Sequence, residues 1–561
     1  MGGRSEFLIT RERSWWLRAA AGPGSGRVAA AAPAAPQRWL PGGSHLRPKE
    51  EKLLFAIGTP PLSGRPRAGA LAALRAPFGS SEFGESAPAG SIPAAGNFKW
   101  FSSRSWPAAR CLSQAVSRSA AEGGLAPLHA GLQLLSCPPW LCAARLANAV
   151  TPLWRLPYQE QLQVKYENQR KILQTLASHL EELGIDVRKG GGLCCPVQPV
   201  VPSPIINGYR NKSTFSVNRG PDGNPKTVGL YVGTGRARNI VCVKANHMEN
   251  IPPKHKQVAQ CYEEFIRGSP LDPCLLFHEG GHWRELVVRT TSRGDTMAIV
   301  TFHPQELGQE ELATQKALLK EFFTCGPGTV CDLTSLYFQE STMTRCSHEQ
   351  SPFQLLHGEP HIFEEVLGLK FRISPDAFFQ VNTGGAEVLY QAVRELSQAG
   401  GDTIFLDICC GTGTISLCLA HQVSKVIGIE VMEKATEDAR WNAAFNGISN
   451  CEFHSGKAEA VLPQLLSSWE DGRPLVAVVN PSRAGLHYRV VRAIRNCTSI
   501  RRLLYISCKP EGEAMRNFVE LCCPPDPKKK LSGEPFVPRL ALPFDMFPHT
   551  VHCELVLLFT R

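Results

Sequence analysis

The stretch FLDICCGTGTISLCLA, residues 405–420, decides the fold of the second half of the chain. An apolar run ends at a turn that contains Gly411 and Gly413, and a helix-length apolar segment follows. Glycine lets the backbone approach a ligand closely, and the start of a helix offers unpaired N–H groups. Ser416 stands where a dinucleotide-binding turn has its third glycine, and the turn lacks the lysine of a P-loop. The stretch therefore predicts a strand, a ligand-binding turn and a helix.

Apolar runs recur after this turn at intervals of helix length. They occupy residues 425–431, 475–480, 501–507 and 553–561. Such alternation is typical of a parallel sheet that is covered by helices on both faces. We therefore expect an α/β fold with a Rossmann-like sheet over residues 372–561 and ligands at the carboxyl ends of its strands. Glu430, at the end of the second run, can accept hydrogen bonds from ribose hydroxyls, which favours a nucleoside cofactor without a pyrophosphate.

Two reactive groups stand at the ends of the later runs. In LLYISCKPEG, residues 503–512, Cys508 follows a buried run, with the cation of Lys509 beside it and Pro510 suited to the first turn of a helix. Such a setting favours a thiolate nucleophile. Glu554 is the only acid in the apolar run HCELVLLF, and burial of a carboxylate raises its pKa toward that of a useful general base.

Together these motifs resemble the TrmA-type RNA uracil-C5 methyltransferases. That family has a G-x-G loop for S-adenosylmethionine, a D-P-P-R segment, an S-C-N-P nucleophile segment and a terminal D-x-F-P-H-T-x-H-x-E. The corresponding segments here are residues 411–413, 480–483, 507–510 and 545–554, and SPDAFFQVN at residues 374–382 resembles the F-F-Q-x-N segment of the family. The resemblance covers residues 150–561. Asn480 replaces the aspartate of D-P-P-R, and Lys509 replaces the asparagine of S-C-N-P. These two changes put the rate of the reaction in question more than its type.

The resemblance implies a class I methyltransferase that transfers a methyl group from S-adenosyl-L-methionine to C5 of uridine in RNA. The substrate would be the T-loop of tRNA, with mitochondrial rRNA as a second candidate. Cys508 would add to C6, which makes C5 nucleophilic, and Glu554 would remove the C5 proton so that the thiol can leave. The candidate cofactor-binding residues are Gln380, Asp407, Gly411, Gly413, Glu430 and Asn480, and the resemblance places Gln380 at the cofactor or the uracil.

Two alternatives remain open at this point. A cytosine-C5 methyltransferase also uses a thiolate at C6, but it would need a Pro-Cys or Thr-Cys nucleophile and not the terminal H-x-E. An RNA-binding or RNA-folding protein with weakened catalysis is suggested by Asn480, although Cys508 and Glu554 argue against it.

The middle of the chain has a different pattern. Residues 149–189 predict a helical lead-in, and residues 190–371 predict a mostly β RNA-recognition domain with two hairpins. The first hairpin begins in a segment that mixes cations with aromatic rings, a composition suited to phosphates and bases, although an exposed hairpin face would give the same pattern. The candidate RNA-binding residues are Tyr209, Arg210, Lys212 and Phe215.

The first 148 residues predict a disordered extension. Residues 1–150 hold 17 Lys/Arg and 7 Glu without any Asp, so the whole net charge of +10 lies there. An Arg-rich and acid-poor segment is typical of a mitochondrial transit peptide, and we expect the protein in the mitochondrial matrix. The 20 cysteines include no C-x-x-C pair, so we expect neither zinc nor an iron–sulfur cluster. We also expect a monomer without a membrane span.

Overall fold

The computed structural model describes residues 139–186, 192–233, 240–275, 280–342, 351–467 and 472–561. The predicted transit segment, up to residue 138, lies outside these ranges. Helix α3 (Pro139–Val150) begins inside the predicted extension and buries Cys142, Leu146 and Ala147 in a hydrophobic core. The prediction that disorder reaches residue 148 is therefore wrong. The segment was predicted to be disordered from its composition, although its buried residues Cys142 and Leu146 are spaced as on one face of a helix.

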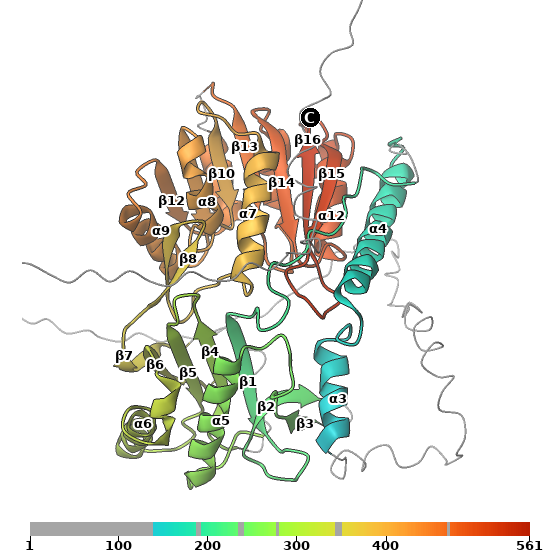
Figure 1. Cartoon of the computed structure of the whole chain (residues 1–561). Helices are drawn as coiled ribbons and strands as arrows, with labels where there is room; N and C mark the ends of the chain where they lie inside the picture. Colours follow the sequence, from blue (N-terminus) through green and yellow to red (C-terminus); the bar gives the residue numbers. More distant parts are fainter. Residues whose placement is uncertain (1–138, 187–191, 234–239, 276–279, 343–350, 468–471) are drawn as a thin grey trace, which may run out of the picture. The chain divides into compact units, whose positions relative to one another are not determined.

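The first large sheet has seven strands in the order β3-β2-β1-β4-β5-β6-β7 (Figure 1). Both predicted hairpins are present, as β1–β2 and β4–β5, and the neighbouring strands are antiparallel except for β5 and β6. Two helices that the sequence pattern did not predict, α5 (Pro253–Gly268) and α6 (Gln309–Thr324), pack into the core of this sheet. The strands are β1 (Lys212–Asn218), β2 (Thr227–Val232), β3 (Val241–Val243), β4 (Trp283–Thr290), β5 (Thr296–Phe302), β6 (Ser335–Glu340) and β7 (Phe353–Gly358).

The second large sheet has the order β12-β11-β10-β13-β14-β16-β15. Its first five strands are parallel, and β16 runs antiparallel between β14 and β15. This arrangement confirms the predicted Rossmann-like sheet. A short hairpin of β8 (Ile362–Val366) and β9 (Leu369–Ile373) precedes it. The strands are β10 (Ile404–Ile408), β11 (Lys425–Glu430), β12 (Cys451–Ser455), β13 (Leu475–Val479), β14 (Ile500–Ser507), β15 (Val537–Phe544) and β16 (Glu554–Thr560).

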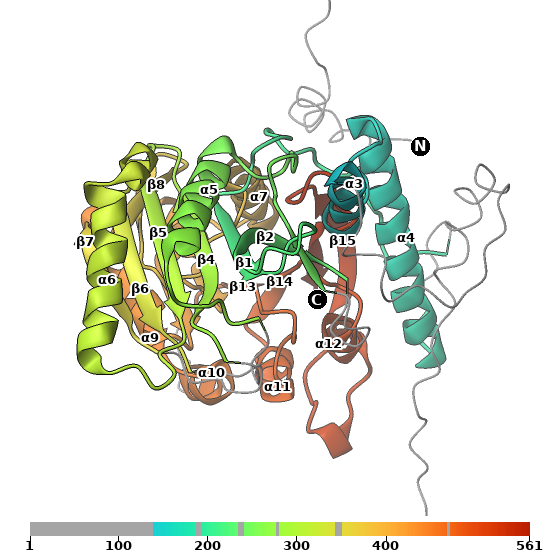
Figure 2. The ribbon, with the colours of Figure 1, turned by 90° about the horizontal axis from the view of Figure 1, so that it is seen from below.

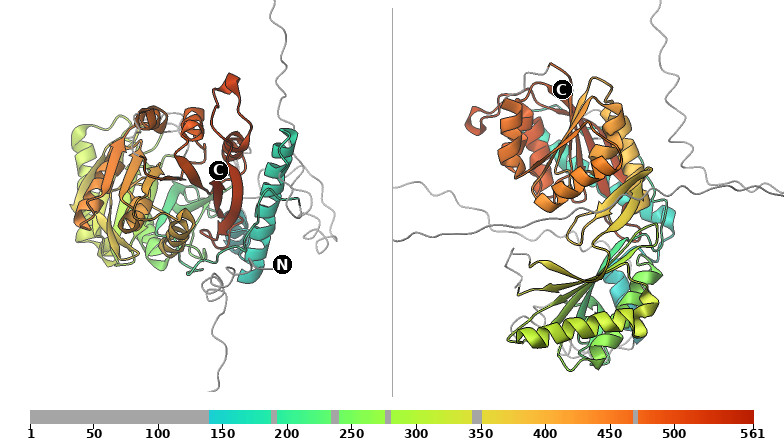
Figure 3. Two further views of the ribbon diagram at one scale, coloured as in Figure 1. Left: turned by 90° about the horizontal axis from the view of Figure 1, so that it is seen from above. Right: turned by 90° about the vertical axis from the view of Figure 1, so that its left-hand side faces the viewer.

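Helices cover both faces of this sheet (Figure 3). Alternate strand residues point to opposite faces, so Phe405 belongs to one core and Leu406 to the other. One face carries α7 (Thr383–Ser397), α8 (Thr414–Leu419) and α9 (Glu433–Phe445), and the other carries α10 (Ala458–Ser467), α11 (Tyr488–Asn496) and α12 (Glu513–Cys522).

Helix α4 (Tyr158–Glu182) is the predicted helical lead-in, and it lies beside β15 (Figures 1 and 2). Its second half buries Leu173, Leu176 and Leu180 in the core that also contains α12. Its first half instead buries polar side chains, at positions 161, 165 and 169. This polar stripe has a definite partner, which lies in the candidate active site.

Candidate active site

The G-x-G turn follows β10 in a left-handed backbone conformation. The φ angles of Cys409, Gly411 and Gly413 are +69°, +57° and +79°. A Cβ at Gly413 would lie 3.1 Å from both Ala439 and Phe453, so this position needs glycine for space as well as for conformation. A Cβ at Gly411 would meet nothing within 4 Å, so the turn has open space at Gly411.

Glu430 holds this turn from the neighbouring strand. Its two carboxylate oxygens each accept a hydrogen bond of 3.0 Å, from the N–H groups of Gly411 and Met432. A carboxylate oxygen has two lone pairs, so both oxygens keep an acceptor position for a further donor such as a ribose hydroxyl. The position agrees with the predicted role, which remains a prediction.

Asp407 lies in β10 and is fully buried. Its Oδ2 accepts hydrogen bonds from the hydroxyl of Ser416 at 2.7 Å and from its N–H at 3.1 Å, which ties helix α8 to the strand. Ser416, which replaces the third glycine of the dinucleotide motif, is thus an anchor of the turn. The Oδ1 atom has no partner in the described residues, and burial raises the pKa of Asp407 to about 7.

Asn480 reaches the same edge of the sheet, whereas Gln380 lies shortly before α7. The N–H of Asn480 donates to the carbonyl of Ile408, at the end of β10. Gln380 is buried, and its main-chain carbonyl accepts a hydrogen bond of 2.7 Å from the side-chain amide of Asn211. The roles of both side chains toward a cofactor remain predictions.

Cys508 follows directly after β14, and Glu554 is the first residue of the adjacent antiparallel strand β16. Ser507 of β14 and Leu555 of β16 form the last pair of this ladder, so Cys508 and Glu554 are the next residues along the two chains. The charge of Glu554 raises the pKa of the Cys508 thiol, which places the two groups near each other. The sheet therefore joins the predicted nucleophile and the predicted base.

The environment of Cys508 differs from the prediction. Burial and the negative charge of Glu554 raise the pKa of the thiol, and Arg483 opposes this shift. Arg483, and not the neighbouring Lys509, is the cation that lowers the pKa of this thiol, so Arg483 favours the thiolate. Pro510 also lies outside the following helix, since α12 begins at Glu513 after Gly512. Both sequence-based reasons for activation are wrong, although the thiol lies where it was predicted.

Glu554 has the predicted environment of a buried acid. The residue is 3% exposed, and burial raises the pKa of the carboxyl from 4.5 to about 8. Burial is the only cause of this shift. The group is therefore ready to exchange a proton near neutral pH, as a general base must.

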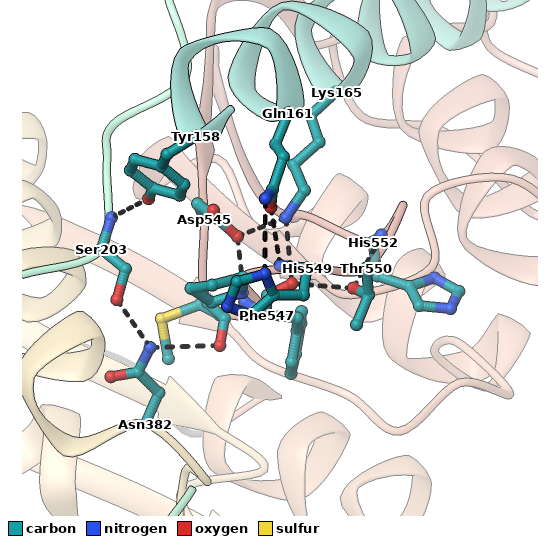
Figure 4. A network of polar contacts seen from close by, with 12 residues as sticks. Tyr158, Gln161, Lys165, Ser203, Asn382, Asp545, Phe547, His549, Thr550 and His552 are labelled. Carbon is teal, nitrogen blue, oxygen red and sulfur yellow. Dashed lines mark hydrogen bonds and ion pairs between the residues drawn. The ribbon is translucent and has the colours of Figure 1, made fainter. Parts of the chain in front are cut away.

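The segment that leads to Glu554 is held by the polar half of α4 (Figure 4). Lys165 forms an ion pair of 2.5 Å with Asp545, and neither side chain is exposed. Its ammonium group also donates to the carbonyl of Phe547 at 3.0 Å. A polar stripe at helical spacing is usually the solvent-exposed face of a helix, which is why the sequence analysis missed this contact.

Gln161 fixes the next part of the same segment. Its Oε1 accepts the backbone N–H of His549 at 2.8 Å, and its Nε2 donates to His549 Nδ1 at 3.3 Å. The ring proton is thereby placed on Nε2, which lies 2.8 Å from Asn207 Oδ1. Burial lowers the pKa of His549, which favours this neutral ring. His549 also has a φ of +68°, a strained conformation that these contacts hold in place.

Replacement of Lys165 tests this arrangement. Lys165→Met would leave Asp545 as a buried charge without its partner, which costs about 3–5 kcal/mol in comparable cases. Chemical denaturation should show a loss of that size, and Lys165→Met/Asp545→Asn should recover part of it. Lys171→Met, at an exposed position of the same helix, is the control and should change stability by less than about 0.5 kcal/mol. Equal effects at positions 165 and 171 would contradict the assignment.

The predicted RNA-binding aromatic residues are not available for stacking. Phe215 is 1% exposed and belongs to the core beneath β1, and Tyr209 is buried with its hydroxyl directed at the carbonyl of Pro548. Their prediction as stacking residues is therefore wrong: Phe215 lies on the inward face of β1, where side chains alternate, and Tyr209, before the strand, is buried against the segment that contains Pro548. Arg210 and Lys212 are only partly buried, and burial, followed by the charges of Arg289 and Arg210, lowers the pKa of Lys212 to about 8.

Some features are absent from the described part of the chain. None of its helices is long and apolar enough to cross a membrane. Among the same residues, no group of three or more His, Cys, Asp or Glu side chains is arranged to hold a metal ion.

A sheet of this order, with a G-x-G turn and an acid at the end of the next strand, defines a Rossmann-like methyltransferase. The chain belongs to the tRNA (uracil-5-)-methyltransferase family, whose model matches residues 365–561. It is 67% identical over 422 residues to human tRNA (uracil-5-)-methyltransferase homolog B, a match that covers 74% of this chain and 84% of the human protein. Human homolog A is 44% identical over 429 residues, with coverage of 74% and 68%.

A solved structure has the same fold. The crystal structure of Pyrococcus abyssi tRNA (uracil-54, C5)-methyltransferase in complex with S-adenosyl-L-homocysteine matches with a TM-score of 0.52 and 23% identity. The match covers 73% of this chain and 85% of the archaeal one. It supports the architecture of the two large sheets.

Proposed function

We propose that this chain is an S-adenosyl-L-methionine-dependent enzyme that methylates C5 of uridine in tRNA through a covalent adduct of Cys508 with C6. The proximity of Cys508 and Glu554, at the adjoining ends of β14 and β16, carries this proposal, because the reaction needs one nucleophile and one base on a single uracil ring. The related homolog B and the Pyrococcus enzyme are both named as tRNA uracil-C5 methyltransferases, which supports the same substrate.

The residues at the G-x-G turn fit the proposed cofactor. The open space at Gly411 and the remaining acceptor positions of Glu430 together offer room and acceptors for an adenosine group. The cofactor supplies a methyl group on a sulfonium, an electrophile toward C5.

The protein performs the remaining steps. The thiolate of Cys508 forms a bond to C6, and the electron pair of the C5–C6 double bond makes C5 nucleophilic. After C5 has gained the methyl group, Glu554 removes the C5 proton. The electrons of that C–H bond restore the double bond, and the bond between sulfur and C6 breaks. Arg483 stabilises the thiolate before it attacks and again when it leaves.

Nucleoside analysis tests the proposal directly. RNA from cells with and without this chain is digested, and its modified nucleosides are measured by mass spectrometry for tRNA and rRNA separately. A loss of 5-methyluridine from tRNA supports the proposal, and a parallel loss from mitochondrial rRNA would add that substrate. A loss of 5-methylcytidine would instead support the cytosine alternative. Unchanged nucleosides would support a role in RNA binding or folding.

Glu430→Ala should weaken the binding of S-adenosyl-L-methionine. The variant removes a charged acceptor of ribose hydroxyls, which is worth about 1.5–3 kcal/mol. Isothermal titration calorimetry would measure the change. Glu433→Ala, an exposed acid at the start of α9, is the matched control and should bind normally. Unchanged affinity in Glu430→Ala would remove this residue from the cofactor site.

We also propose that the protein acts in the mitochondrial matrix, directed there by its basic N-terminal segment. Fusion of residues 1–138 to a fluorescent protein should bring that protein into mitochondria, whereas a chain that begins at residue 139 should remain outside. Microscopy and protease protection would measure both. Mitochondrial import of the shortened chain would refute this role of the segment.

A further inference from the structure

Charge is unevenly distributed within the methyltransferase part of the chain. Residues 151–561 contain 43 Lys/Arg and 43 Asp/Glu, yet residues 472–510 contain eight Lys/Arg and no acid. This acid-free stretch includes β13, α11 and β14, and it ends just after Cys508. A segment of this composition beside a proposed RNA site requires a physical explanation.

Some of these cations have roles within the fold. Arg495 is fully buried and donates to four backbone carbonyls, among them those of Cys523 and Gly533. Arg502 donates to the carbonyl of Leu396, and Arg501 pairs with Glu534. These contacts explain why the three arginines are present without any external partner.

Other cations of the stretch lie at the surface on one path. Arg483 lies beside the thiol of Cys508, and α11 then presents Tyr488 and Arg489 to solvent and Arg492 in a half-exposed position. Arg489 Nε donates a hydrogen bond of 3.3 Å to the hydroxyl of Tyr488. This hydrogen bond, followed by the charges of Arg489, Arg492 and Lys530, lowers the pKa of Tyr488, so the four side chains lie in one positive region.

A turn from a distant part of the sequence continues this path. Lys528, Lys529 and Lys530 are exposed, and Asp526 caps the turn by accepting the N–H groups of the first two. Asn496, at the end of α11, donates to the carbonyl of Lys530 at 3.0 Å, which fixes the turn to the helix. Figure 2 shows the loop between α12 and β15 projecting beyond both helices.

The neighbouring acids do not neutralise this region. Glu513 and Glu520 both pair with Arg516, and Glu534 pairs with Arg501. Glu511 is exposed and lies near His552, at the Cys508 end of the path. Asp526, which caps the lysine turn, offsets one of its three positive charges. The path therefore keeps a net positive charge along α11 and the lysine turn.

We propose that Arg483, Tyr488, Arg489, Arg492 and Lys528–Lys530 form a basic track that binds the phosphate backbone of the substrate RNA outside the loop that contains the target base. Arginine and lysine bind phosphates without reading sequence, and an exposed tyrosine offers a ring on which a base can stack. The track starts at the nucleophile, so it holds the RNA that flanks the flipped uridine. The inference rests on the proposed function, because it assumes an RNA substrate.

Charge removal on the lysine turn provides the test. The variant Lys528→Gln/Lys529→Gln/Lys530→Asn removes three charges, and asparagine suits the left-handed φ of +58° at residue 530. The control Arg145→Gln/Lys171→Gln/Lys320→Gln removes three exposed charges from α3, α4 and α6. The affinity of each protein for a full-length tRNA and for the isolated T-arm stem-loop is measured between 50 and 200 mM salt.

The turn variant should bind full-length tRNA at least about tenfold more weakly at 0.1 M salt, and its salt dependence should lose a slope of about one for each lost contact. Its kcat at saturating RNA should be unchanged, and its affinity for the stem-loop should fall less. Normal affinity and slope, or equal losses in the control, would overturn the track. Binding does not require methyl transfer, so the two proposals can fail separately. If the native protein forms no 5-methyluridine but the turn variant still binds tRNA more weakly, the proposed function is refuted and the basic track is not.

Discussion

Glu554→Gln is expected to trap the protein on its RNA as a covalent, methylated adduct. Glutamine keeps the shape of the side chain but cannot accept the C5 proton. Addition of Cys508 to C6 and transfer of the methyl group do not require removal of that proton, whereas the final elimination does. The adduct should survive denaturing electrophoresis, carry a labelled methyl group and accumulate to about one equivalent of protein.

The raised pKa of Glu554 gives this variant two further signatures. The native enzyme needs the ionised carboxylate, so its elimination rate should rise with pH until the pH passes about 8. In the folded state the carboxyl keeps its proton between pH 4.5 and 8, whereas in the unfolded chain it does not, so its ionisation weakens folding as pH rises through that window. Glu554→Gln removes this penalty. It should therefore melt above the native protein at pH 8 and close to it below pH 4.5.

The double variant Cys508→Ala/Glu554→Gln is the control for the adduct. It should form none, since no group can attack C6. Normal turnover of Glu554→Gln would assign the base elsewhere, and His552 would be the first residue to test. A variant that binds RNA and cofactor without forming an adduct would show that Glu554 acts earlier, in positioning the uracil.

Cys508→Ala should reduce methylation below detection, the largest loss expected from any single substitution. Without addition at C6, C5 of uracil is too weak a nucleophile to displace the methyl group. The thiol acts on the base alone, so calorimetry should show normal cofactor binding and gel-shift assays should show normal RNA binding. Cys497→Ala, at another half-buried cysteine, should retain full activity. Turnover by Cys508→Ala would remove this residue as the nucleophile.

The central strands were predictable because each is an apolar run between helix-length segments. The edge strands were not, for a physical reason: an edge strand is only partly buried, so its sequence need not be apolar throughout. Strand β15 contains Pro538 and Pro543, residues that an edge tolerates and a central strand does not. Strand β12, at the other edge, is short and carries charged Glu452.

The two reactive groups of the candidate site were also predictable, whereas their neighbours were not. A single acid in an apolar run has to be buried, and Glu554 is. The neighbours of Cys508 depend on which strands lie side by side, so Arg483, from the loop after the adjacent strand β13, affects the pKa of the thiol and Lys509 from the same segment does not. Likewise, the sequence of α4 alone does not show whether the face with Gln161 and Lys165 is exposed to solvent or packed against Asp545.

The insertion of β16 between β14 and β15 has a consequence for the synthesis of the protein. The ion pair that holds the segment before the proposed base joins Lys165 and Asp545, which are 380 residues apart in the sequence. While the ribosome has produced only the segment with Lys165, this lysine has no counter-charge, and β16 with Glu554 has not yet been made. Long-range pairing of this kind folds slowly, and the incomplete chain exposes unpaired strand edges. A nascent chain can therefore hold neither a working base nor a closed sheet until β16 has been made, so methylation begins only after synthesis of the domain is complete.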